Sequence, residues 1–118
     1  MSKIKINVII KNNNDKINFN TTAIFRENKI EYIEDNNTIT KFDFEKKQLI
    51  RTNDIIKMVY YFDKNKETEG LITLKESNTT VTINITTNKI KRKDHDIKIE
   101  YSIENEVFLY QIKEIKWV

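Results

Sequence analysis

The chain has 118 residues, of which 38% are hydrophobic and 33% charged, and a chain of this length closes one domain around a single core. The 21 basic and 18 acidic residues leave a net charge of +3, too small an excess to indicate a nucleic-acid partner. Cysteine is absent, which excludes disulfides and thiolate sites. There is no apolar run of about 20 residues that could span a membrane and no secretory signal. We therefore expect a cytoplasmic protein with no membrane partner.

The N-terminal segment alternates between apolar and polar residues from Ile4 to Ile10, and this period of two predicts a strand. Proline is absent and Gly70 is the only glycine, so asparagine and aspartate must make the turns. A turn at Asn13-Asn14 places Ile10 opposite Ile17 and starts a second strand of the same kind.

The same alternation continues through the middle of the chain. A short loop before Thr40 places Tyr32 opposite Thr40 and Ile30 opposite Phe42. A two-residue turn at Lys46-Lys47 would then place Phe42 opposite Arg51 and Phe44 opposite Leu49. A second two-residue turn at Asn53-Asp54 would pair Arg51 with Ile56 and Leu49 with Met58. The segment 86–96 is polar and basic, and we expect it to be irregular.

The successive reversals all keep the apolar side chains on one side of the sheet. No segment of ten residues has the spacing of an apolar helix face. An open meander of about ten strands would leave two exposed edges, and closure removes them. The pattern thus predicts an all-β, antiparallel up-and-down closed β-barrel over residues 1–118. A two-sheet sandwich is the alternative.

The order and spacing of several segments resemble the uncharacterised YwiB-like β-barrel family of bacteria. The resemblance runs over nearly the whole chain and is carried by residues 17–34, 49–54, 58–62 and 97–101. It implies a calycin-like (lipocalin-like) barrel and an arginine at position 51, and it brings no activity, substrate or cofactor. Ala23 and Asn53 stand where relatives tend to have glycine. The Gly-Xaa-Trp signature of true lipocalins is absent, and the one tryptophan is Trp117.

Arg51 is the one charge on the predicted inward face, and a buried guanidinium needs a partner or an anion. One hypothesis is that it binds a hydrophobic or anionic amphipathic ligand inside the barrel, with tyrosine hydroxyls orienting that ligand. The candidate ligand-binding residues are Arg51, Tyr32, Phe42, Met58, Tyr60, Tyr101 and Tyr110. The alternative is a filled interior, in which Arg51 reaches the barrel mouth and the tyrosines are core residues.

Other motifs favour no catalytic role. Asp94-His95-Asp96 groups three potential metal ligands, but neighbours on an extended chain cannot converge on one ion. We expect no metal, no cofactor and no enzyme activity. The basic cluster 89–93 lacks interleaved aromatic residues, which favours a solvated loop over nucleic-acid binding.

The outward face carries apolar residues, and Ile33 and Ile39 should be cross-strand neighbours there. A contiguous apolar patch of this kind indicates an interface, so a homodimer or a protein partner is the competing functional class.

Overall fold

The computed structural model describes residues 2–34 and 37–116, and these form ten antiparallel strands. The strands are β1 (Ser2–Lys11), β2 (Lys16–Arg26), β3 (Lys29–Ile33), β4 (Ile39–Asp43), β5 (Gln48–Thr52), β6 (Ile56–Tyr61), β7 (Thr68–Leu74), β8 (Thr79–Lys93), β9 (Asp96–Ile103) and β10 (Glu106–Glu114). Each pairs with the next, and β1 pairs with β10, so the sheet is a closed barrel. The predicted all-β up-and-down barrel is confirmed. No helix in the described part of the chain is long and apolar enough to cross a membrane.

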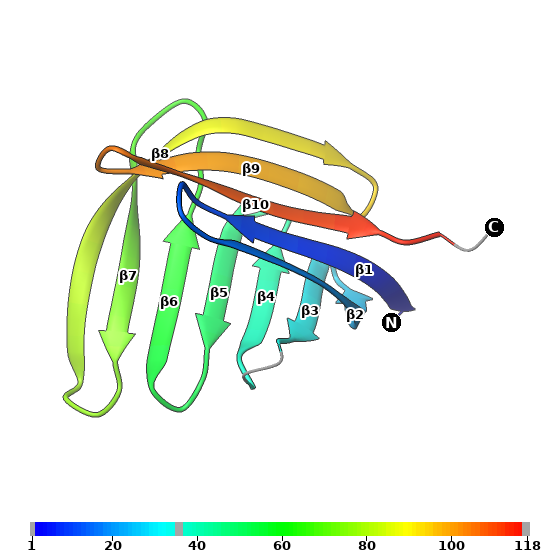
Figure 1. Cartoon of the computed structure of the whole chain (residues 1–118), viewed down its shortest axis with the longest axis horizontal. Helices are drawn as coiled ribbons and strands as arrows, with labels where there is room; N and C mark the ends of the chain where they lie inside the picture. Colours follow the sequence, from blue (N-terminus) through cyan, green and yellow to red (C-terminus); the bar gives the residue numbers. More distant parts are fainter. Residues whose placement is uncertain (1, 35–36, 117–118) are drawn as a thin grey trace.

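The strands of the barrel run in two main directions. In Figure 1, β1, β2, β9 and β10 run across the view, whereas β3 to β7 run from top to bottom. The turn between β7 and β8 and the start of β8 project beyond the crossing strands (Figure 1). One end of the barrel is therefore covered by the crossing strands, and the other extends past them.

The strand register follows the predicted pairing at the first hairpin and between β3 and β4. Ile10 pairs with Ile17 across β1 and β2, and Tyr32 pairs with Thr40 across β3 and β4. The expected contact between Ile33 and Ile39 is also present. In the turn between β1 and β2, the Asn12 Oδ1 accepts hydrogen bonds from the amides of Asn14 and Asp15.

The predicted register of β5 is wrong by two residues on each side. Arg51 pairs with Met58 rather than Ile56, and it faces Thr40 rather than Phe42. Leu49 correspondingly pairs with Tyr60 and Phe42. Both errors have one cause, which is that the turns are longer than two residues. Because a shift of two preserves the alternation, the residues predicted to point inward from β5 and β6 still do so.

Side-chain capping explains the longer turns. The Asn53 Oδ1 accepts hydrogen bonds from the amides of Ile55 and Ile56, at 2.9 and 3.0 Å. The Asp43 Oδ1 accepts in the same way from the amides of Glu45 and Lys46. Each Asx turn begins at its capping residue, so the reversal spans two residues more than the sequence indicated.

The expectation of an irregular segment at 86–96 is also wrong. β8 continues to Lys93, and its pairing with β9 is interrupted only by a bulge between Thr87 and Lys89. Thr87 is buried, and beyond the bulge Ile90 occupies the inward position opposite Ile99. A single extra residue shifts the alternation by one, which is why the segment shows no period of two.

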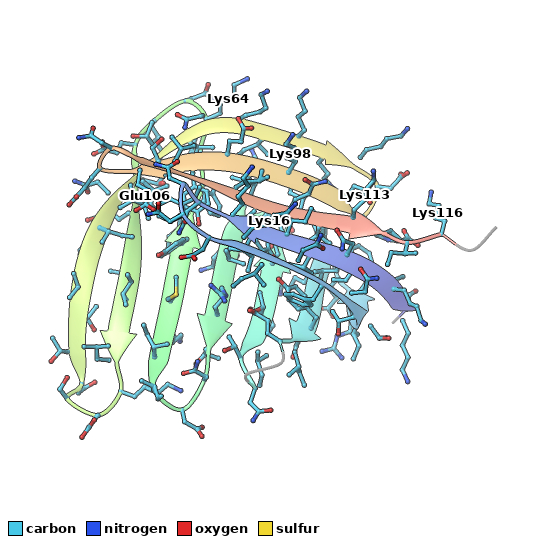
Figure 2. The ribbon with its side chains drawn as sticks, viewed as in Figure 1. Lys16, Lys64, Lys98, Glu106, Lys113 and Lys116 are labelled. Atoms are coloured by element: carbon cyan, nitrogen blue, oxygen red, sulfur yellow. The ribbon has the colours of Figure 1, made fainter. Side chains whose placement is uncertain are left out.

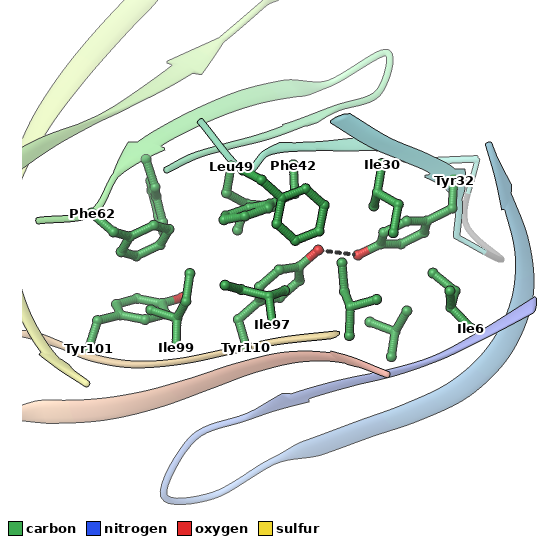
Figure 3. Close-up of a cluster of buried hydrophobic side chains, with 14 of the residues drawn as sticks. Ile6, Ile30, Tyr32, Phe42, Leu49, Phe62, Ile97, Ile99, Tyr101 and Tyr110 are labelled. Atoms are coloured by element: carbon green, nitrogen blue, oxygen red, sulfur yellow. Dashed lines mark hydrogen bonds between the residues drawn. The ribbon is translucent and has the colours of Figure 1, made fainter. Parts of the chain in front are cut away.

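The core fills the covered end of the barrel. Figure 3 shows Ile30, Tyr32 and Phe42 from one wall facing Ile6 and Tyr110 from the other. The side chains of Phe42, Ile30, Ile6 and Tyr110 are at most 1% exposed. The ring of Phe44 packs edge-on against Phe42 at 5.2 Å between centroids. Side chains rather than a cavity occupy this end.

Candidate functional site

At the other end of the barrel, near the turn between β7 and β8, inward-facing apolar residues are exposed. Met58, Ile72 and Ile83 belong to the partly buried shell around the core. At the rim, the inward-facing Leu74 and Val81 are 44% and 49% exposed. The register sets Met58 opposite Ile72, and Ile72 opposite Val81, on three adjacent strands. These side chains form a continuous apolar wall that faces water.

Arg51 stands at the edge of this wall and is paired with Glu34. The Arg51 Nε donates to Glu34 Oε2 at 3.0 Å, and its Nη2 donates to Glu34 Oε1 at 2.8 Å. The Thr40 hydroxyl also donates to Glu34 Oε2, at 2.5 Å. The Glu34 side chain is 6% exposed and that of Arg51 is 21% exposed. The bidentate geometry satisfies both charges inside the chain.

This pair changes the role expected of Arg51. Burial alone lowers the pKa of Arg51, but the hydrogen bonds and the negative charge of Glu34 outweigh burial and raise that pKa above its ordinary value. The guanidinium therefore stays charged and is neutralised by Glu34. An external anion is not required to stabilise it. Glu34 was missed in the sequence, although the alternation Ile30, Tyr32, Glu34 places it on the inward face.

Five of the seven candidate ligand-binding residues are buried in the core, and three of them, Tyr32, Phe42 and Tyr110, pack at its covered end. The hydroxyls of Tyr32 and Tyr110 hydrogen-bond each other at 2.8 Å (Figure 3). Burial raises the pKa of both phenols, so both are neutral in this contact. Phe42 is fully buried and its ring lies 6.1 Å from that of Tyr110. These residues pack against one another at the covered end of the barrel.

Tyr60 and Tyr101 differ from that pair. Their rings meet edge-to-face with centroids 6.1 Å apart. Burial raises the pKa of both phenols, and the charge of Arg51 offsets part of that rise. Within residues 2–34 and 37–116, neither hydroxyl forms a hydrogen bond with another residue. Every fully buried side-chain oxygen in this part of the chain has a hydrogen-bond partner. Both residues are nevertheless buried, with 6% of Tyr60 and 5% of Tyr101 exposed. Their hydroxyls are two hydrogen-bonding groups without an assigned partner near the charge of Arg51.

Gly70 sets the position of Tyr60. It lies between Tyr60 on β6 and Ile83 on β8 in the register. A Cβ atom at Gly70 would lie 2.9 Å from Tyr60 Cδ1 and 3.0 Å from Ile83 Cγ1, closer than side chains normally approach. The missing side chain lets the Tyr60 ring lie over the β7 backbone.

The remaining sequence motifs have structural partners. His95 Nδ1 lies 2.7 Å from Glu114 Oε1, and its ring lies 4.3 Å from that of Phe25. In the described residues, no group of three His, Cys, Asp or Glu side chains is placed to hold a metal ion. Arg92 lies over the Phe44 ring at 4.3 Å and donates to the Asn28 side chain. Trp117 lies outside the described residues.

Comparison with protein-family models and with curated protein sequences finds no match. Comparison with solved structures finds the crystal structure of the ywiB protein from Bacillus subtilis. The two chains are 17% identical, the alignment covers 97% of this chain and 91% of that chain, and the TM-score is 0.55. The resemblance to YwiB-like barrels is thus confirmed at the level of the fold: this chain is a closed ten-stranded antiparallel barrel similar to that of the ywiB protein.

Proposed function

We propose that the open half of the barrel binds a small amphipathic molecule. The observation that carries the proposal is the partly exposed apolar wall of Met58, Ile72 and Val81, which continues along β6 into Tyr60, whose ring meets that of Tyr101. Apolar surface with a few convergent polar groups is the usual composition of a ligand site. The proposed role is one of binding.

The polar end of the ligand should be uncharged. Glu34 already neutralises Arg51 and occupies its Nε and Nη2 donors. A carboxylate would lose its hydration and would meet the nearby negative charge of Glu34. An alcohol, ester or amide could instead hydrogen-bond the two tyrosine hydroxyls while its apolar chain covers the wall. This narrows the sequence-based hypothesis, which allowed an anionic ligand.

Calorimetric titration with a medium-chain fatty alcohol and with the fatty acid of equal length tests the proposal. The alcohol should bind the native protein more tightly than the acid. Replacing both hydroxyls, Tyr60→Phe with Tyr101→Phe, should weaken alcohol binding about tenfold, since each lost hydrogen bond is worth roughly 0.5–1.5 kcal/mol. Tyr61→Phe is the matched control, because Tyr61 is 40% exposed on the outer face.

Two results would refute the proposal. One is the absence of binding for both compounds at their solubility limit. The other is an equal loss of affinity in the control and in the double variant, which would place the ligand elsewhere on the barrel.

A second candidate function is an interaction through the outer surface, as expected from the outward apolar residues. The paired Ile33 and Ile39 are 59% and 43% exposed, and Ile50, Val59 and Leu71 face one another across β5, β6 and β7. Clustered exposed apolar side chains favour an interface. Sedimentation equilibrium should show a dimer that Ile33→Asp with Ile39→Asp dissociates. A monomer at every protein concentration removes the homodimer from consideration.

A further inference from the structure

A basic hollow lies on the outer surface of β8, β9 and β10. Its volume is about 550 Å³, and its lining includes Lys91, Lys93, Lys98 and Lys113. Figure 2 shows Lys98 and Lys113 projecting from the outer side of β9 and β10. The sequence placed only the cluster 89–93 together. The sheet adds one lysine from β9 and one from β10.

The charge of the chain is concentrated in this hollow. Five basic residues and Asp96 give the lining a net charge of +4, so the rest of the chain carries −1 within a total of +3. Among the described residues none of the four lysines forms a salt bridge. The Asp96 Oδ1 accepts a hydrogen bond from the Glu114 amide instead.

The register makes this arrangement unfavourable without a partner. Lys91 pairs directly with Lys98, so two like charges stand opposite each other on the same face. Like charges at directly opposed positions destabilise a sheet. Lys93 lies two residues further along the same strand and points the same way. An anion with several charges spaced along a chain would relieve this repulsion at each lysine.

We infer that the basic hollow binds the phosphate backbone of single-stranded nucleic acid without reading its bases. Lysines act as point charges toward phosphates. Because no aromatic side chain lines the hollow, the four lysines would hold the strand through its phosphates alone. A concave surface suits a narrow strand, whereas docking on a membrane surface needs protruding apolar side chains. The weak net charge argued against this partner in the sequence, but net charge does not show how the lysines cluster.

Salt dependence of binding tests this inference. A fluorescein-labelled thymidine oligonucleotide should bind with log K falling against log[salt] at a slope of about −2.8, if four lysines each neutralise one phosphate at roughly −0.7 per contact. Between about 50 and 200 mM salt the affinity should then fall about 50-fold. An adenosine oligonucleotide should behave in the same way, because the bases are not read.

The variant Lys91→Gln with Lys98→Gln should halve the slope to about −1.4. The matched control is Lys57→Gln with Lys64→Gln, which makes the same charge change at exposed lysines outside the hollow, and it should leave the slope unchanged. Equal effects of the two double variants would overturn the inference, as would binding to anionic phospholipid vesicles with none to the oligonucleotide. Circular dichroism confirms that each variant is folded.

Discussion

Glu34→Ala should lower the free energy of unfolding by about 2–3 kcal/mol, as measured by urea denaturation at neutral pH. The substitution leaves the guanidinium of Arg51 in a mostly buried position without its carboxylate. Breaking one partner of a buried pair costs about 3–5 kcal/mol, and the partial exposure of Arg51 places the effect at or below the lower end of that range. The Thr40 hydroxyl loses its acceptor as well.

A double variant distinguishes the effect of removing the whole Glu34–Arg51 ion pair from the effect of removing Glu34 alone. Glu34→Leu with Arg51→Met removes both charges and keeps most of the volume, so it should be considerably more stable than Glu34→Ala. Glu34→Gln should lie between them, because the amide still accepts a hydrogen bond from Arg51 but carries no charge. If the double variant loses at least as much stability as Glu34→Ala, the pair is not the reason that Arg51 is tolerated inside.

Gly70→Val should lower the free energy of unfolding by about 2 kcal/mol, since overpacking a filled site typically costs 1–3 kcal/mol. The new Cβ would stand 2.9 Å from Tyr60 Cδ1 and 3.0 Å from atoms of Ile83 and Ile85. The Tyr60 ring must turn away, so binding of the fatty alcohol should weaken together with stability. Urea denaturation and the calorimetric titration measure the two effects.

The control for this prediction is Thr82→Val, which introduces the same side chain at an exposed position of the neighbouring strand β8. Gly70 has no positive φ, so the effect should come from contact rather than backbone strain. A Gly70→Val protein as stable as the parent would show that Tyr60 and the two isoleucines move aside without cost.

The fold was predictable because alternation survives errors in turn length. The pairing of Ile10 with Ile17 followed directly from a turn at Asn13-Asn14. The predicted turn at Asn53 gave a strand register that is wrong by two residues, but this error moves no side chain to the other face of the sheet. The prediction assumed turns of two residues. It therefore missed the Asx turns, in which the side chain of Asn53 or Asp43 accepts hydrogen bonds from the amides that follow it. The bulge after Thr87 was missed because it breaks the period on which the prediction rests.

The site was only partly predictable. Arg51 stood out as a charge among apolar residues, but its partner Glu34 lies 17 residues away and comes close only through the pairing of β3, β4 and β5. The alternation placed Tyr32, Tyr60, Tyr101 and Tyr110 on one face without distinguishing them. Only the tertiary structure distinguishes Tyr32 and Tyr110, whose hydroxyls hydrogen-bond each other, from Tyr60 and Tyr101, whose rings meet edge-to-face.

The measurement that tests the central claim most directly is thiol labelling of single-cysteine variants, for which the cysteine-free chain provides a clean background. Val81 and Ile6 both face the interior, but Val81 is 49% exposed and Ile6 is 0% exposed. If one end of the barrel is open and the other filled, Val81→Cys should react with a thiol reagent nearly as fast as an outer-surface control, Val107→Cys. Ile6→Cys should react only as fast as the protein unfolds. Equal protection of both interior cysteines, or equal reactivity, would contradict the account.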